Sequence, residues 1–228
     1  MATYVLVHGA TGGGWQMRPL AVALQAAGHY VQRPTLTGLG ERSHLLRPEI
    51  DLATHVQDIV NVLQYEDLHE VILVGKSYSG IVITGVAEQT PERLAHLVYL
   101  DALVPGDRQS FLEILGPEVA ERMAERVRER GDGWRLPADR SVEPRLADHP
   151  FGSLTQRIAL SNPAAARLPR TYIRCTAVPA HTPHARVTAA SAQRAVAAGW
   201  RYRELPADHN PESVPAPELV QFLLELAG

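Results

Sequence analysis

Short apolar runs that alternate with segments of helical periodicity give this chain its pattern. Strands are predicted at residues 3–7, 29–33, 71–74, 97–100, 171–176 and 200–205. Apolar residues recur at helical spacing over residues 18–27, 51–65, 188–198 and 217–227, and a further helix is expected after the turn at residues 75–80. Asp51 and Asp58 are expected on the solvated side of the second helix. This alternation is typical of an α/β fold with a mostly parallel sheet covered by helices on both faces.

The alternation stops between residues 105 and 169, where the chain is charged, punctuated by proline and helical in pattern. Residues 118–130 carry Glu and Arg at i,i+4 distances, which is typical of a solvated helix face. Inserted at this point of an α/β sheet, the segment is expected to form a helical cap over the active site. With 228 residues and 45% hydrophobic content, the chain is expected to form one domain, 1–228, that includes this cap.

The strand predicted at 71–74 runs directly into the sequence GKSYSG, residues 75–80. This pattern predicts a strand, a sharp turn and a helix, with Ser77 at the apex of the turn. Small residues on either side let strand and helix pass closely, and the first amides of the helix point at whatever the serine attacks. The alternative is an ordinary turn with a surface serine. A phosphate-binding loop is excluded because Glu70 stands where that loop needs glycine.

The first predicted strand ends in a second glycine-rich loop, with the sequence HGATGGGW. Without side chains in the way, its backbone amides can approach a ligand closely. In a serine hydrolase a loop at this place supplies the second oxyanion amide. A plain turn or a dinucleotide-binding loop is the alternative, but the glycines do not fit the spacing G-x-G-x-x-G.

Three residues with complementary chemistry follow predicted strands: Ser77 follows one strand, Asp101 the next and His209 the last. The carboxyl ends of parallel strands meet at one edge of a sheet, where α/β proteins gather their sites. Serine needs a neutral imidazole to take its proton, and a carboxylate to hold that imidazole in the correct tautomer. The alternatives are a surface histidine and an aspartate that caps a loop, and Asp208 is a rival for the role of the acid.

Several segments carry a resemblance to a known family: residues 8–10 with Trp15, 34–42, 75–80, 97–102 and 208–209. On these the chain resembles, over essentially its whole length, the α/β-hydrolase superfamily. It is most similar to the branch of bacterial EstC-like esterases, with plant methyl-salicylate-type esterases and hydroxynitrile lyases as more distant relatives. The resemblance implies ester hydrolysis in which Ser77 attacks, His209 is the base and Asp101 orients it.

The same resemblance implies that the backbone amides of Ala10 and Tyr78 hold the oxyanion. Substrate contacts are expected from the glycine-rich loop, at Gly9, Thr11 and Trp15.

The chain departs from its relatives at three places. Lys76 stands where these elbows usually carry histidine, and Ser79 stands where they carry glycine. Plant relatives place an aspartate after the strand that ends here at Thr176, but residues 177–180 contain no carboxylate. Asp101, at the end of the preceding strand, is therefore predicted to be the acid.

The expected substrate is a small or medium apolar ester, lactone or aryl ester. Hydroxynitrile lyases of this branch resemble one another in having threonine at the position of Gly9 and lysine after the catalytic histidine, where this chain has Asn210; this favours hydrolysis. Lyase, retro-aldol or cyclase chemistry on the same scaffold is the alternative, and a binding protein on a degenerate hydrolase fold is a third.

The overall charge disfavours polyanionic partners. The net charge is −3, the pI is about 6.4, and there is no Lys/Arg run, so neither nucleic acid nor an anionic membrane is an expected partner. A single cysteine, Cys175, and no signal-peptide pattern or apolar stretch near 18 residues predict a cytoplasmic protein. No His/Cys/Asp cluster has ligand spacing, so no metal or other cofactor is expected. A homodimer is left open.

Overall fold

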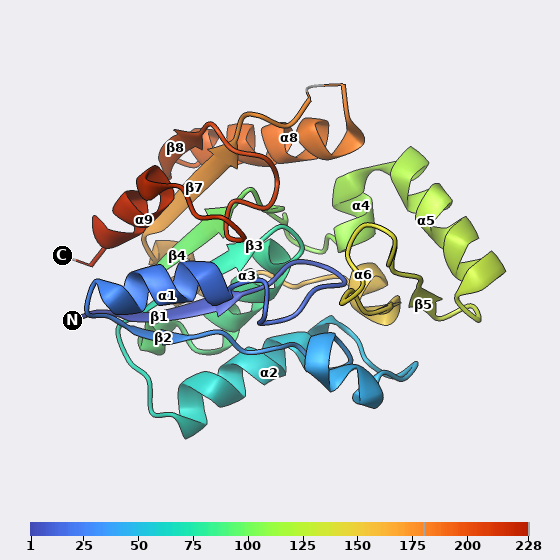
Figure 1. Cartoon of the computed structure of the whole chain (residues 1–228), viewed down its shortest axis with the longest axis horizontal. Helices are drawn as coiled ribbons and strands as arrows, with labels where there is room; N and C mark the ends of the chain where they lie inside the picture. Colours follow the sequence, from blue (N-terminus) through green and yellow to red (C-terminus); the bar gives the residue numbers. More distant parts are fainter. Residues whose placement is uncertain (180, 228) are drawn as a thin grey trace.

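The computed structural model describes residues 1–179 and 181–227. Its centre is a six-stranded sheet with the order β2-β1-β3-β4-β7-β8, in which every pairing is parallel (Figure 1). The strands are β1 Thr3–Val7, β2 Tyr30–Gln32, β3 Val71–Lys76, β4 Leu94–Leu100, β7 Arg170–Cys175 and β8 Arg201–Leu205. The predicted α/β fold is confirmed.

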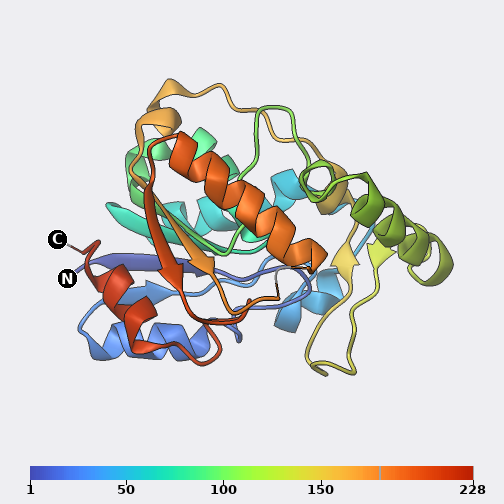
Figure 2. The ribbon, with the colours of Figure 1, turned by 90° about the horizontal axis from the view of Figure 1, so that it is seen from above.

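Helices cover both faces of the sheet, as Figure 2 shows from above. One face carries α1 Arg18–Ala26 and α9 Pro217–Leu224, and the other carries α2 Leu52–Tyr65, α3 Ser79–Gln89 and α8 Pro183–Ala197. The alternation along β1 shows how the strands serve both layers. Tyr4 and Leu6 pack with α1 and α9, whereas Val5 and Val7 pack with α2 and α3. Helix α3 is buried over most of its length, which fixes the turn that precedes it.

The segment inserted after β4 lies to one side of the sheet as far as about residue 155 and then returns toward the start of β7 (Figure 1). It contains α4 Phe111–Leu115, α5 Pro117–Arg130, the short antiparallel pair β5 Arg135–Leu136 and β6 His149–Pro150, α6 Gly152–Thr155 and α7 Pro163–Arg167. Two 3-10 helices, Gly40–Leu45 and Pro91–Arg93, complete the elements. Phe111, Leu154 and Ile158 join the core cluster of α2 and α3, so the insertion packs on the same core as the sheet.

Three local expectations were wrong, each because a polar side chain finds a backbone partner. Helix α8 begins at Pro183 rather than near residue 188, since Thr182 caps it by accepting from the Ala185 amide at 3.2 Å. Asp51 caps α2 by accepting from Thr54 N at 2.9 Å. Asp58 is not simply solvated, because it accepts from the Thr37 amide at 2.6 Å and so holds the loop after β2.

Among the helices of residues 1–179 and 181–227, none combines the length and the apolar character that crossing a membrane requires.

Candidate active site

Ser77 sits between β3 and α3 in a left-handed backbone conformation, with φ of 55°. Such a conformation is costly for a residue with a side chain, and tight packing has to maintain it. A Cβ at Gly75 would lie 2.6 Å from the Ser79 carbonyl oxygen, and one at Gly80 would lie 2.2 Å from the Leu103 carbonyl oxygen. Both glycines are therefore needed for the close passage of strand, turn and helix that the sequence pattern predicts.

The serine at the usual glycine position also has a place in this turn. Ser79 is fully buried, and its hydroxyl donates a short hydrogen bond to the carbonyl of His8 at the end of β1. It thereby ties the first turn of α3 to the glycine-rich loop.

Ser77, His209 and Asp101 lie in one hydrogen-bonded line. His209 Nε2 is 3.0 Å from Ser77 Oγ, and His209 Nδ1 is 2.8 Å from Asp101 Oδ2. Asp101 is fully buried, and its other oxygen accepts from the Cys175 amide at 3.2 Å. Asp208, the rival acid, is exposed and accepts from the Asn210 amide at 2.8 Å instead. The contact expected between Asp101 and the far ring nitrogen of His209 is present.

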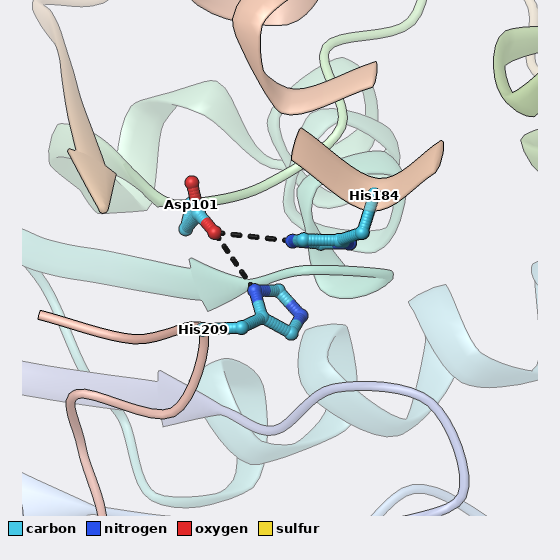
Figure 3. A group of neighbouring side chains, drawn as sticks. All are labelled: Asp101, His184 and His209. Atoms are coloured by element: carbon cyan, nitrogen blue, oxygen red, sulfur yellow. Dashed lines mark hydrogen bonds and ion pairs between the residues drawn. The ribbon is translucent and has the colours of Figure 1, made fainter. Parts of the chain in front are cut away.

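A second histidine, absent from the sequence-based expectations, shares the same carboxylate oxygen. His184 Nε2 lies 3.1 Å from Asp101 Oδ2, and its ring centroid is 3.6 Å from that of His209 (Figure 3). It comes from the first turn of α8, which begins earlier than predicted. Because His184 and Asp101 are 83 residues apart, only their nearness in the fold brings them together.

The charges at this site are set by burial and by these contacts. Burial alone would raise the pKa of the Asp101 carboxyl, but hydrogen bonds from His184 and His209 outweigh it and hold that pKa below its ordinary value. Burial, with repulsion from Lys76, lowers the pKa of His209 despite its hydrogen bond with Asp101. At neutral pH the pair is therefore a carboxylate and a neutral imidazole, the state in which His209 can accept a proton.

The two expected oxyanion donors border Ser77. Within residues 1–179 and 181–227, neither the Ala10 nor the Tyr78 amide hydrogen-bonds to another protein group, so both remain available to a ligand. Hydrogen bonds of the His8 ring fix the loop that carries Ala10. His8 Nε2 accepts from the Leu36 amide at 3.1 Å, which leaves His8 Nδ1 to donate to the Gly9 carbonyl at 2.8 Å.

Two further buried histidines bind groups beside the two oxyanion donors: the Thr11 amide, next to Ala10, and the side chain of Tyr78. His149 Nδ1 accepts from the Thr11 amide at 3.1 Å. His55 Nε2 lies 3.0 Å from the Thr37 carbonyl, which requires a proton on that nitrogen, so Nδ1 accepts from the Tyr78 hydroxyl at 2.8 Å.

All three buried histidines are neutral at pH 7. Burial lowers the pKa of His8 and of His55 to about 4, and it lowers the pKa of His149 well below its ordinary value. Their tautomers are fixed by these contacts, so they act as rigid supports of the two loops.

A cavity of about 710 Å³ opens in front of Ser77 and His209. Ala10, Thr11 and Trp15 line it, together with Val142, Glu143, Arg145 and Leu146 of the insertion. Gly9 does not line it. A Cβ there would lie 3.3 Å from Ser77 Cβ, so this glycine serves the close packing of the loop against the elbow rather than direct contact with a ligand.

The wall of the cavity is more polar than the sequence suggested. The Arg145 guanidinium lies 3.8 Å from the centroid of the Trp15 ring and covers it. Trp15 Nε1 and Gln16 Oε1 are buried and have no hydrogen-bond partner among residues 1–179 and 181–227. Both atoms are packed inside the glycine-rich loop rather than exposed to the cavity, so the polar groups of the wall are those of Glu143, Arg145 and Asn210.

Lys76 is paired beneath His209. Its Nζ donates to Asn210 Oδ1 at 2.7 Å and lies 3.8 Å from the carboxylate of Glu212. Both charged side chains are buried, and burial raises the pKa of Glu212 against the attraction of Lys76. The contact links the end of β3 to the loop that carries His209.

Comparison with known proteins gives a consistent picture. The model of the alpha/beta hydrolase family matches residues 4–221. The "Carbendazim hydrolyzing esterase" of Nocardioides sp. (strain SG-4G) is 50% identical over 115 residues, which are 50% of this chain and 48% of that protein. "Salicylic acid-binding protein 2" of Nicotiana tabacum is 33% identical over 105 residues, 45% of this chain and 40% of that protein. These alignments thus span less than half of either relative.

Among solved structures, an extracellular alpha/beta-hydrolase from a Paenibacillus species superposes with a TM-score of 0.81. The superposition covers 100% of this chain and 98% of the other at 21% identity, so it bears on the fold alone.

Proposed function

The chain belongs to the alpha/beta hydrolase family, and from this premise we propose that it is a serine esterase that cleaves a carboxylic ester through an acyl-enzyme at Ser77. The observation that carries the proposal is the hydrogen-bonded line from Ser77 through His209 to Asp101, on a strained turn at the mouth of a cavity. The Nocardioides relative, which is named an esterase, supports it.

In this mechanism Ser77 Oγ attacks the ester carbonyl while His209 Nε2 takes the hydroxyl proton. The Asp101 carboxylate stabilises the imidazolium that forms, and the amides of Ala10 and Tyr78 donate to the oxyanion. His209 then gives its proton to the departing alkoxide, which leaves as an alcohol. Water, deprotonated by the same imidazole, attacks the acyl-enzyme and releases the acid.

Covalent labelling and turnover test this assignment together. A fluorophosphonate probe is expected to label the protein once, at Ser77, and Ser77→Ala or His209→Ala is expected to reduce turnover by about 10⁶-fold. Ser161→Ala, a change at an exposed serine outside the site, serves as the control and should keep labelling and rate. Near-normal turnover by Ser77→Ala would refute the mechanism.

The substrate we propose is a small or medium ester or lactone that carries polar groups beside its apolar part. The polar side chains among the residues that line the cavity, Glu143, Arg145 and Asn210, support this, because they can pair with polar groups of a ligand. A panel of alkyl, aryl and heteroaryl esters tests it, and includes carbendazim because the name of the Nocardioides relative gives it as that protein's substrate. Higher kcat/KM for members that carry polar groups supports the proposal; preference for plain alkyl esters contradicts it.

Lyase, retro-aldol or cyclase chemistry remains the second candidate, since the same oxyanion donors and base would serve it. Single labelling of Ser77 combined with no turnover on the ester panel would favour this candidate. For the setting, we propose a small-molecule enzyme of the cytoplasm, supported by the single buried cysteine, which fits a reducing compartment.

A further inference from the structure

Three potential metal ligands converge at the back of the candidate site. The Asp101 carboxylate, His184 and His209 each offer an atom, and these atoms all lie within 4.8 Å of one another (Figure 3). Both imidazoles point a ring nitrogen at the same carboxylate oxygen, at 3.1 Å from His184 and 2.8 Å from His209. From this arrangement we infer that the three side chains form a zinc-binding site, and that zinc bound there inhibits the enzyme.

The donor set and its spacing fit zinc. Two imidazoles and one carboxylate, with a fourth position for water, are a common ligand set of Zn²⁺. With bonds of about 2.0–2.1 Å, the ligand atoms of a tetrahedral site stand about 3.3 Å apart. The two oxygen-to-nitrogen distances, 3.1 and 2.8 Å, need to open by only a few tenths of an ångström, and the two ring nitrogens, which lie within 4.8 Å of each other, need to reach the same spacing. The ion would take the place of the two protons that the imidazoles direct at Asp101.

A zinc ion can also reach these atoms. The side chains of His184 and His209 keep 29% and 24% of their surface exposed, whereas Asp101 is fully buried. Lys76, which repels positive charge at His209, is paired with Glu212 at 3.8 Å, which offsets its repulsion of the ion. The buried carboxylate supplies the negative charge at the centre of the group.

Inhibition follows from the tautomer of His209. Zinc on Nδ1 displaces the proton that now lies between Nδ1 and Asp101, and a neutral imidazole then carries its proton on Nε2. Nε2 is the atom 3.0 Å from Ser77 Oγ, so the lone pair that should accept the serine proton is lost. His184 also stays neutral when zinc binds its Nε2, because its proton moves from Nε2 to Nδ1. No net proton or electron is exchanged with other reagents, and a chelator should reverse the effect.

The loss of activity rests on the proposed esterase function, but the binding of zinc does not. Zinc binding by the full chain is therefore measured directly, by isothermal titration calorimetry and by the ¹⁵N signals of the histidine rings. Hydrolysis of the best ester is followed in parallel at increasing ZnCl₂ and after addition of EDTA. We expect one zinc per chain, perturbed signals from His184 and His209, and inhibition that EDTA reverses.

His184→Gln removes one ligand while keeping a polar group, and it is expected to raise the half-inhibitory zinc concentration, relative to its own rate, by at least about 10-fold. His69→Gln is the matched control, because His69 is an exposed histidine beside a carboxylate, 3.2 Å from Asp67. It should leave zinc inhibition unchanged.

The ¹⁵N signals of the histidine rings in the wild-type chain test the zinc site even where a variant folds poorly. Zinc inhibition that His184→Gln leaves unchanged, or saturating zinc without a change in the His209 signals, would overturn the site. A chain that binds one zinc through these residues but hydrolyses no ester would keep the site and reject the proposed function.

Discussion

The buried pair of Lys76 and Glu212 allows a prediction whose size follows from the structure. Lys76→Met removes the cation but keeps the length of the side chain, and it leaves the Glu212 carboxylate buried 3.8 Å from where its counter-ion stood. Neither carboxylate oxygen has a hydrogen-bond partner among residues 1–179 and 181–227, so Lys76 supplies the main compensation. Breaking such a pair costs about 3–5 kcal/mol, whereas replacing both members costs much less.

The assay is urea unfolding of four proteins: wild type, Lys76→Met, Glu212→Gln and the double variant. At pH 7 the free energy of unfolding should fall by about 3–5 kcal/mol in Lys76→Met, and the double variant should recover most of it. The pKa of Glu212 is already raised, and more so without Lys76, so the loss should shrink as the pH falls toward 4.5 and the carboxyl protonates. A Lys76→Met chain within about 0.5 kcal/mol of wild type would refute the account.

Three other expectations follow from the site and its supports. Asp101→Asn keeps the shape of the side chain but presents an amide that favours the wrong tautomer of His209, so turnover should fall by about 10⁴-fold, measured as kcat with circular dichroism as a check on folding. Burial lowers the folded-state pKa of His8 and of His55 to about 4, and it lowers that of His149 well below its ordinary value. The stability that the three neutral rings contribute is therefore present above pH 6.5 and is lost as the pH falls toward 4, up to about 3 kcal/mol each for His8 and His55; unfolding midpoints between pH 7 and 4 measure this. Gly80→Ala puts a Cβ 2.2 Å from a backbone oxygen and should lower both the thermal midpoint and turnover. Gly133→Ala is the control: nothing lies within 4 Å of its Cβ, so only the strain of its positive φ of 80° should affect stability.

Local signals were sufficient to predict the sheet and the first members of the site. The β-branched run before Ser77 and the glycines around it require a strand that turns sharply into a helix, and the structure has this turn. Asp101 and His209 could be placed because each follows a predicted strand, and parallel strands deliver their carboxyl ends to one edge.

The supporting residues carry no such signal. His184 lies in the first turn of α8, in a stretch that sequence periodicity did not assign to a helix, because Pro183 and Thr182 define the start rather than an apolar pattern. Glu212 resembles any charged residue of a loop near the end of the chain until the fold buries it against Lys76, 136 positions away by number. Contacts of this kind depend on how loops cross, which neither composition nor periodicity encodes.

The departures of this chain from its relatives argue against a degenerate site once their partners are considered. Asp101 can replace a carboxylate after β7 because β4 lies between β3 and β7 in the sheet, so its end is adjacent to the elbow. Lys76 is matched by Glu212, and Ser79 by the carbonyl of His8. A site that had lost its function would have no reason to pair a buried lysine with a buried carboxylate beneath the base, since unpaired burial is costly and a smaller apolar side chain would avoid it. The pairing of each unusual residue is better explained by an elbow and base that are still held in position for chemistry.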